Sequence, residues 1–548
     1  MRSLNRNSER ECSRGGNLFK NLLYILPLCL FFSYYPVISF GSSETMNFEL
    51  SVPLLWLVGF DAVILVMGVR QKMFWKGIVK RWMWLLLPVW LSVSVLWSLN
   101  PVRGILTAGI LWLIYMAVYG MWYFRGMLVA EDKMVWWKWF FGATLVACAW
   151  CVVQCALDLA GVGREYGLMC AGCTYQMFGF PHPNGFAIEP QFMGNLLLAP
   201  VIVTAWMVVQ GNWNDAFRGR VARSRRHGAR ALILGRNLRK PLKTSSPIAH
   251  ALGSSSVPVV KTTTGSRFLG FEFLLFCFFM ISATLFLTFS RGAIYAFGVG
   301  MVFMSAFVMV RERERRKGVL KRLGIVWGTV AVAFVVTLNV QGVMSAVSPT
   351  SDTYVDGVAK ALHHLSLGVV DVRNRTVDSQ PEEVEVVEDE VVENFVENSE
   401  ENEAVFDGYV AESTDTRLRL TGVAMEAWSK SPQTVLLGVG LGGAGQALYN
   451  DGLSPSPKEI VQNEYASLLL ETGLIGIGLL MLTILLVVRA VIRWRKASGM
   501  ILALLVAYGV TLMFFSGLPN ALQIYLLPGV LMVMLSEKCD RHKSARLL

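Results

Sequence analysis

The chain of 548 residues is too apolar for a soluble protein. It is 54% hydrophobic and only 16% charged, with a mean hydropathy of +0.48, whereas about 25% charged residues is usual in soluble domains. Several uninterrupted apolar runs have about 20 residues, the length that crosses a bilayer, so a soluble enzyme is excluded. The basic residues behind the net charge of +11 lie in short connections between these runs, which membrane topology explains better than nucleic-acid binding.

The apolar runs predict an all-α integral membrane protein with about 12 transmembrane helices. The first run follows a basic stretch, and no small-residue cleavage site comes after it, so we expect a retained helix with a cytoplasmic N-terminus. The runs lie near residues 20–40, 51–69, 82–99, 104–124, 139–160, 191–210, 268–289, 292–310, 323–342, 466–488, 498–516 and 521–536.

The distribution of Lys and Arg predicts the orientation. With the N-terminus inside, 40 of the 50 basic residues fall on cytoplasmic segments and 10 on outer ones, a strong positive-inside bias. We therefore expect a multi-pass protein of the cytoplasmic (inner) membrane with both termini cytoplasmic. The expected regions are a nine-span membrane region 1–342, a large outer loop 343–465 between helices nine and ten, a three-span region 466–536 and a tail 537–548.

Two long connections have unusual charge. Residues 211–267 contain twelve basic residues and the single acid Asp215; we expect a disordered loop on anionic lipid headgroups, with nucleic-acid or protein docking as the alternative. Residues 376–416 lack Lys and Arg and include twelve acids between Asp378 and Glu403. This charge predicts a disordered insertion, and cation binding or acceptor docking is the alternative.

The outer loop before the sixth span is dense in polar groups. His182 and Glu189 lie where this loop re-enters the membrane, so either is a candidate for proton transfer. The alternative is that His182 caps the turn and that Glu189 caps the following helix, whose N-terminal dipole favours an acid. Cys170 and Cys173 form either a local disulfide or two free thiols in an oxidising compartment.

Arginines mark the outer face as an anion site. Arg291 joins the seventh and eighth spans, and Arg417 and Arg419 directly follow the acidic stretch. A guanidinium group donates two hydrogen bonds at fixed geometry to phosphate oxygens and never loses its charge. For Arg291 alone, snorkelling at the membrane interface is the alternative.

The last part of the outer loop is rich in glycine. Gly438, Gly440, Gly442 and Gly443 fall within six residues, a pattern that matches neither a P-loop nor a dinucleotide fingerprint. Glycines let a backbone approach a ligand or another helix closely. The sequence Gln462-Asn-Glu-Tyr then leads into the tenth span.

The order of these motifs resembles the O-antigen ligase and O-antigen polymerase family. The motifs are His182-Pro-Asn, Ser290-Arg-Gly-Ala, the long outer loop, Leu437-Gly-Val-Gly-Leu-Gly, Gln462-Asn-Glu-Tyr and Leu469-Leu-Glu-Thr-Gly-Leu-Ile-Gly. The resemblance covers roughly residues 80–535, without the acidic insertion or the basic cytoplasmic loop.

The resemblance implies a large integral-membrane glycosyltransferase of the GT-C type, with no metal or other cofactor. The implied donor is a glycan on polyprenyl diphosphate, and the implied acceptor is a hydroxyl of a glycan, a lipid-linked sugar or a protein. Arg291 corresponds to the arginine of the family's Ser-Arg-Gly motif, and Arg164 more loosely to its outer-loop arginine. We expect Arg417 and Arg419 to assist in binding the diphosphate, and Asn184 and Asn463 to position the acceptor.

The chain departs from the family at Gln462, where ligases commonly carry the histidine that activates the acceptor. Glutamine is not a base. Either Gln462 positions the acceptor while Glu189, His182 or Glu464 takes the proton, or the chain is a polymerase-like relative, or it has lost activity. The sequence leaves ligase and polymerase open.

Two other classes of function are compatible with the composition. Twelve spans are common in transporters, and outer arginines suit a lipid-linked glycan or another anionic solute, but the two halves of this chain differ where transporters often show repeats. A membrane scaffold with the acidic loop as a docking site is the third possibility.

Overall fold

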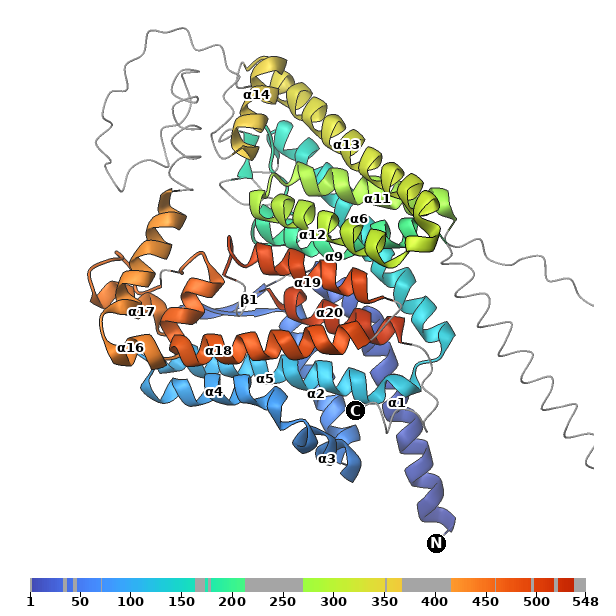
Figure 1. The fold of residues 1–548 in the computed structure, drawn as a ribbon, viewed down its shortest axis with the longest axis vertical. Coiled ribbons are helices and arrows are strands. Elements are labelled where there is room, and N and C mark those ends of the chain that lie inside the picture. Colours follow the sequence, from blue (N-terminus) through green and yellow to red (C-terminus); the bar gives the residue numbers. More distant parts are fainter. Residues whose placement is uncertain are drawn as a thin grey trace, which may run out of the picture.

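The computed structural model describes residues 2–32, 37–42, 47–69, 71–162, 173–175, 179–211, 270–349, 352–366, 415–458, 460–493, 497–516 and 521–536. Helices dominate this part of the chain (Figure 1). The N-terminal elements are α1 (Arg2–Phe31), β1 (Val37–Ser42), β2 (Asn47–Ser51), α2 (Val52–Val69), α3 (Lys72–Lys80), η1 (Trp82–Leu85), α4 (Leu86–Ser94), η2 (Val95–Trp97), α5 (Pro101–Phe124), η3 (Arg125–Met127), α6 (Ala130–Leu159) and α9 (Pro190–Gln210).

The C-terminal half contributes the remaining helices. They are α11 (Phe271–Leu287), α12 (Arg291–Arg311), η5 (Arg313–Arg315), α13 (Arg316–Val347), α14 (Tyr354–Leu365), a helix over 415–429, α16 (Pro432–Leu437), α17 (Ala444–Asn450), α18 (Glu464–Arg493), α19 (Ser498–Thr511) and α20 (Leu522–Leu535). The predicted outer loop 343–465 is therefore helical over much of its described length.

Within the described ranges, seven helices are long and apolar enough to cross a membrane, or eight if a pair bent by 77° at Arg81 counts as one span. Four shorter apolar helices have 10–17 residues. Each predicted apolar run overlaps one of these twelve elements. The polytopic α-helical membrane class is confirmed, and the number of twelve spans stays a prediction.

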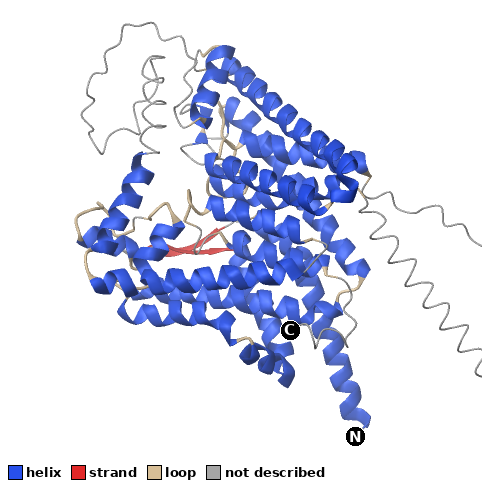
Figure 2. Ribbon diagram, in the orientation of Figure 1, coloured by secondary structure: helices blue, strands red, loops and turns tan. Residues whose placement is uncertain are grey.

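A two-stranded hairpin departs from the all-α prediction. β1 and β2 pair antiparallel with an irregularity between Ser39 and Gly41, and they are the red arrows of Figure 2. The prediction that the first span continues to residue 40 is wrong, because its helix ends at Phe31 and β1 begins at Val37. Pro36 lies in the interval; proline lacks the N–H that a helix needs and disfavours helical geometry at the preceding residue.

Helix α9 forms the centre of the bundle. It packs against α11, α12 and α19 (Figure 1), and its residues from Met193 to Val209 are all buried. A helix that is apolar on every side is stable only where other helices surround it or lipid covers it. This burial fixes the N-terminal end of α9, which carries Glu189 and Gln191, against the neighbouring helices.

Helix α18 is broken at Gly473, whose φ of 63° and ψ of −169° are not helical. A break leaves carbonyl groups without intrahelical partners, and in a membrane protein these must be satisfied by other groups. The carbonyl of Leu470 accepts from Val439 N at 2.9 Å, and the carbonyl of Glu471 accepts from Gly440 N at 2.9 Å. The glycine-rich segment therefore satisfies the backbone of the broken helix.

The glycines of this segment make backbone contacts that a side chain would block. A Cβ on Gly438 would lie 2.3 Å from the Glu471 backbone, and one on Gly440 would lie 2.3 Å from Ser98. Both glycines have positive φ. Of the two uses that the sequence left open, the structure shows close approach to other helices: the segment joins α18 to the η2–α5 connection.

We expect Gly473→Ala to destabilise the protein by about 1 to 3 kcal/mol, the usual cost of an unfavourable φ/ψ at a non-glycine residue. A Cβ at Gly473 would also lie 2.3 Å from the Leu436 backbone. The measurement is reversible unfolding in mixed detergent micelles. Gly478→Ala is the matched control, because that exposed glycine of the same helix has no atom within 4 Å of an added Cβ. Equal stability of the two variants would contradict a structural role for the break.

Candidate functional site

A sharp turn between α11 and α12 presents Arg291. Phe289 has a φ of 49° and is the only non-glycine residue with positive φ in the described part of the chain; such a conformation costs about 1–3 kcal/mol unless its surroundings impose it. Arg291 is the first residue of α12 and is 7% exposed. The turn thus places a buried guanidinium group at a helix N-terminus.

An aromatic and imidazole stack surrounds this turn. The ring of His182 stacks on Phe180 and on Phe289, with centroids 5.2 Å apart in both pairs, and meets His364 edge-on at 5.7 Å. Burial lowers the pKa of His182 to about 3, so its imidazole is neutral near pH 7. The structure therefore places His182 inside the packing that supports the Phe289 turn.

Arg417 links two other helix starts. Its Nε donates to Gln462 Oε1 at 2.8 Å, and its Nη2 donates to Gln191 Oε1 at 3.4 Å. Gln191 in turn donates to the carbonyl of Phe514 at 2.8 Å. The side chain of Gln462 thus accepts a hydrogen bond from an arginine.

Glu189 lies beside this arginine at the start of α9. Its side chain is exposed and makes no capping hydrogen bond to the helix, so the capping alternative does not describe it. Desolvation by the surrounding protein raises the pKa of Glu189, and the positive charge of Arg417 opposes this rise. Glu189 is therefore an accessible carboxylate next to a cation.

The residues after Gln462 begin α18. Asn463 Oδ1 accepts hydrogen bonds from the backbone N–H groups of Tyr465 and Ala466, at 3.1 and 3.2 Å, and so caps the helix. Glu464 is 8% exposed and accepts from Ser516 Oγ at 3.0 Å. Both side chains thus contribute to the packing of the start of α18.

Asn184 lies inside the loop before α9. It is fully buried, accepts a hydrogen bond from Gln154 Nε2 at 3.1 Å and donates to the carbonyl of Ala187 at 2.7 Å. Gln154 also accepts from Gly185 N at 2.7 Å. The structure therefore shows Asn184 holding the path of the loop that leads to Glu189.

The remaining predicted arginines are separate from this cluster or outside the described chain. Arg419 is exposed, and it lies two residues from Arg417 on the same helix, which turns the two side chains to different faces. Arg164 lies outside the described residues. Cys173 is disulfide-bonded. Cys170, like Arg164, lies outside the described residues. Within the described ranges, no group of three or more His, Cys, Asp or Glu is arranged to hold a metal ion.

The starts of α9 and α12 are in direct contact. A Cβ on Gly194 would lie 2.7 Å from Ala293 Cβ, and one on Gly292 would lie 3.5 Å from Gln191 Nε2. Helix N-termini carry partial positive charge and unpaired N–H groups, which favour anions. Together with α18, which begins beside Gln462, three helix N-termini gather around the arginines.

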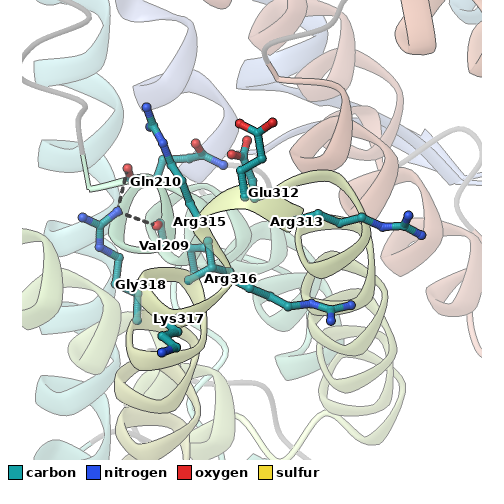
Figure 3. Close-up of a pocket in the computed structure, with 11 residues that line it drawn as sticks. Val209, Gln210, Glu312, Arg313, Arg315, Arg316, Lys317 and Gly318 are labelled. Atoms are coloured by element: carbon teal, nitrogen blue, oxygen red, sulfur yellow. Dashed lines mark hydrogen bonds between the residues drawn. The ribbon is translucent and has the colours of Figure 1, made fainter.

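A cavity of about 650 Å³ lies far from this cluster, beyond the C-terminal end of α12 (Figure 3). It is lined by Val209, Gln210, Glu312, Arg313, Glu314, Arg315, Arg316, Lys317, Gly318, Val319 and Arg322. The 21 residues of α12 separate it from Arg291 by about 30 Å at the usual helical rise of 1.5 Å per residue. The cavity and the arginine cluster are therefore at opposite ends of the helix.

Three residues that the sequence did not single out complete the cluster. Gln191 follows Glu189-Pro190 at a helix start, where a polar residue was a usable signal. Phe289 gave none, because its positive φ depends on the tertiary packing. His364 sits at the end of the amphipathic helix α14, where the His363-His364 pair could have drawn attention.

Comparison with known proteins bears on the C-terminal half of the chain. Residues 275–481 match the family model described as O-antigen ligase, a region that contains Arg291, Arg417 and Gln462 but ends before the last two helices. Comparison with curated proteins and with solved structures finds no match. The match confirms, over residues 275–481, the resemblance to the O-antigen ligase family seen in the sequence.

Proposed function

We propose that the protein transfers a glycan from a polyprenyl diphosphate carrier to an acceptor hydroxyl on the outer side of the cytoplasmic membrane. The O-antigen ligase family implies membrane glycosyl transfer or ligation, and the donor, the acceptor and the side of the membrane are part of the proposal. The observation that carries it is the gathering of Arg291 and Arg417 at three helix N-termini.

The electrostatics of this cluster suit a diphosphate. Outside the cell no nucleotide sugar is available, so the free energy of transfer comes from the bond between the sugar and the carrier diphosphate. Breaking that bond leaves negative charge on the diphosphate, which donors and charges fixed in advance stabilise. Arg291 and Arg417 supply guanidinium groups, and the start of α12 supplies N–H groups.

The acceptor hydroxyl loses a proton in the same reaction, and we assign Glu189 as the base. It is exposed beside Arg417, whereas His182 is buried against two phenylalanines and Glu464 is buried against Ser516. A raised pKa makes the carboxylate a stronger base. Its proximity to Arg417 puts the base next to the leaving diphosphate.

Gln462 then has a defined part without acting as a base. Its amide oxygen accepts from Arg417 Nε and so orients the guanidinium group. The absence of the usual histidine is compatible with activity when Glu189 takes the proton. Ligase and polymerase remain two versions of the same chemistry with different acceptors.

A transporter for a lipid-linked glycan is the second candidate. The same arginines would bind the diphosphate headgroup, but an exposed carboxylate beside them favours a reaction over simple binding. The two functions separate in a purified system, because only a transferase joins the glycan covalently to an acceptor.

We expect Arg291→Lys and Arg417→Lys each to lower glycan transfer at least tenfold, since lysine keeps the charge and loses the forked hydrogen bonds. A loss of this size corresponds to about 1.5 to 3 kcal/mol, the value typical of hydrogen bonds to charged groups. The assay uses purified protein with a defined polyprenyl-diphosphate donor. Arg419→Lys, at the exposed position nearby, should stay within threefold of wild type. Full activity of Arg291→Lys would remove that residue from the site and favour snorkelling.

Glu189→Gln should lower the turnover number about 100-fold or more, the usual contribution of a general base. In the wild type, activity should fall as the pH drops through the raised pKa of Glu189, above the ordinary value of 4.5, because only the carboxylate accepts the proton. The residual activity of Glu189→Gln should lack this acidic limb. Glu464→Gln is the comparison: if it, and not Glu189→Gln, removes the limb, Glu464 is the base.

The outer position of residues 343–465 is tested by labelling. Glu400→Cys should react with a membrane-impermeant maleimide on intact cells, and Ser255→Cys should react only after permeabilisation, because the 40 to 10 distribution of basic residues puts residues 211–267 inside. The disulfide at Cys173 supports an oxidising compartment for the loop before α9. Labelling of Ser255→Cys on intact cells would reverse the topology.

A further inference from the structure

Helix α14 reaches the arginine site from the predicted outer loop. It packs along α13, and its last residue, Leu365, contacts α12. The hydroxyl of Tyr295 in α12 donates to the carbonyl of Leu365 at 2.5 Å. The end of α14 is thus held one helical turn from Arg291.

His364 contacts the turn itself. Its Nε2 lies 3.3 Å from the carbonyl oxygen of Phe289, and its ring packs on Phe289 with centroids 6.2 Å apart. His364 is 5% exposed. Since a carbonyl only accepts, the Nε2 atom carries the proton in this hydrogen bond. The positive φ of Phe289 is therefore stabilised by a donor from a different part of the chain.

The arginines of the site also affect the pKa of the His364 imidazole. Burial lowers the pKa of His364 well below its usual range, and the nearby positive charges of Arg291 and Arg417 add to the effect. His364 is accordingly neutral, with one N–H to donate, and it lies close to both arginines. His364 therefore contacts the turn that directly precedes Arg291.

We propose that His364 is a positioning residue for Arg291: by donating to the Phe289 carbonyl, it holds the left-handed turn that aims the guanidinium group of Arg291 at the donor diphosphate. The inference rests on the proposed function. Through His364, the outer segment around α14 then takes part in catalysis, although the His364 side chain touches no reacting atom. Only Ser290 lies between the held carbonyl of Phe289 and Arg291, so a small change in the turn is transmitted directly to Arg291.

Three variants separate this role from the general docking of α14. His364→Gln keeps an N–H donor near the place of Nε2, and His364→Phe keeps the aromatic packing and removes the donor. Tyr295→Phe removes the other hydrogen bond between α12 and α14 and leaves the Phe289 carbonyl contact intact. Each protein is purified in full length, and its melting temperature is compared with wild type.

Two measurements are made on each variant. The first is the turnover number and the KM for a defined polyprenyl-diphosphate donor. The second is independent of activity: the rate at which phenylglyoxal modifies Arg291, followed by mass spectrometry, with and without inorganic diphosphate. Because the second measurement needs no turnover, it tests the position of Arg291 even if the wild type transfers no glycan, a result that would remove the proposed function alone.

The expected result is a turnover number at least tenfold lower for His364→Phe, with the donor KM within threefold of wild type, and an Arg291 modification rate changed at least threefold with weaker protection by inorganic diphosphate. His364→Gln and Tyr295→Phe should stay within threefold of wild type in both measurements. The proposal is overturned if His364→Phe leaves the Arg291 modification rate unchanged, if glutamine restores no more than phenylalanine, or if Tyr295→Phe matches His364→Phe.

Discussion

The hydrogen bonds of Arg417 are the constraint on which the site depends. One guanidinium group joins Gln462, which precedes α18, to Gln191 at the start of α9, and the helix that carries Arg417 belongs to the predicted outer loop. The core helix α9, the broken helix α18 and the outer segment therefore meet at a single side chain. Because α9 is buried from Met193 to Val209, its start is attached to a rigid core helix, and Arg417 fixes the outer segment relative to it.

The glycine-rich segment makes this arrangement possible at the level of the backbone. The carbonyls of Leu470 and Glu471 at the break in α18 accept from Val439 and Gly440, so the segment that follows the Arg417 helix is bound to the same helix whose start carries Gln462. In a membrane protein a helix break without such partners is costly. The break in α18 and the glycine-rich segment thus hold the outer segment in place. Their role is structural.

The sequence predicted what depends on composition and local pattern: the helical membrane class, the position of each apolar run, and the arginines at a span junction and after the acidic stretch. It did not predict the hairpin at Val37, the hydrogen bond between Arg417 and Gln462, or the support of Phe289 by His364. The two side-chain contacts join residues 45 and 75 positions apart, and no local periodicity encodes such pairs. Gln462 illustrates the difference. The sequence showed that a glutamine is not a base, and only its contact with Arg417 in the structure indicated that it orients this arginine.

The central claim is that Arg291 and Arg417 bind the diphosphate of the donor together. The most direct measurement is an experimental structure of the protein in a lipid nanodisc with a non-hydrolysable polyprenyl-diphosphate glycan. The account predicts density for the diphosphate within hydrogen-bonding distance of both guanidinium groups, at the starts of α9 and α12, with Glu189 facing the anomeric carbon. Density for the diphosphate in the basic cavity between Arg313 and Arg322, or beside Arg419 with Arg291 and Arg417 free of it, would contradict the account.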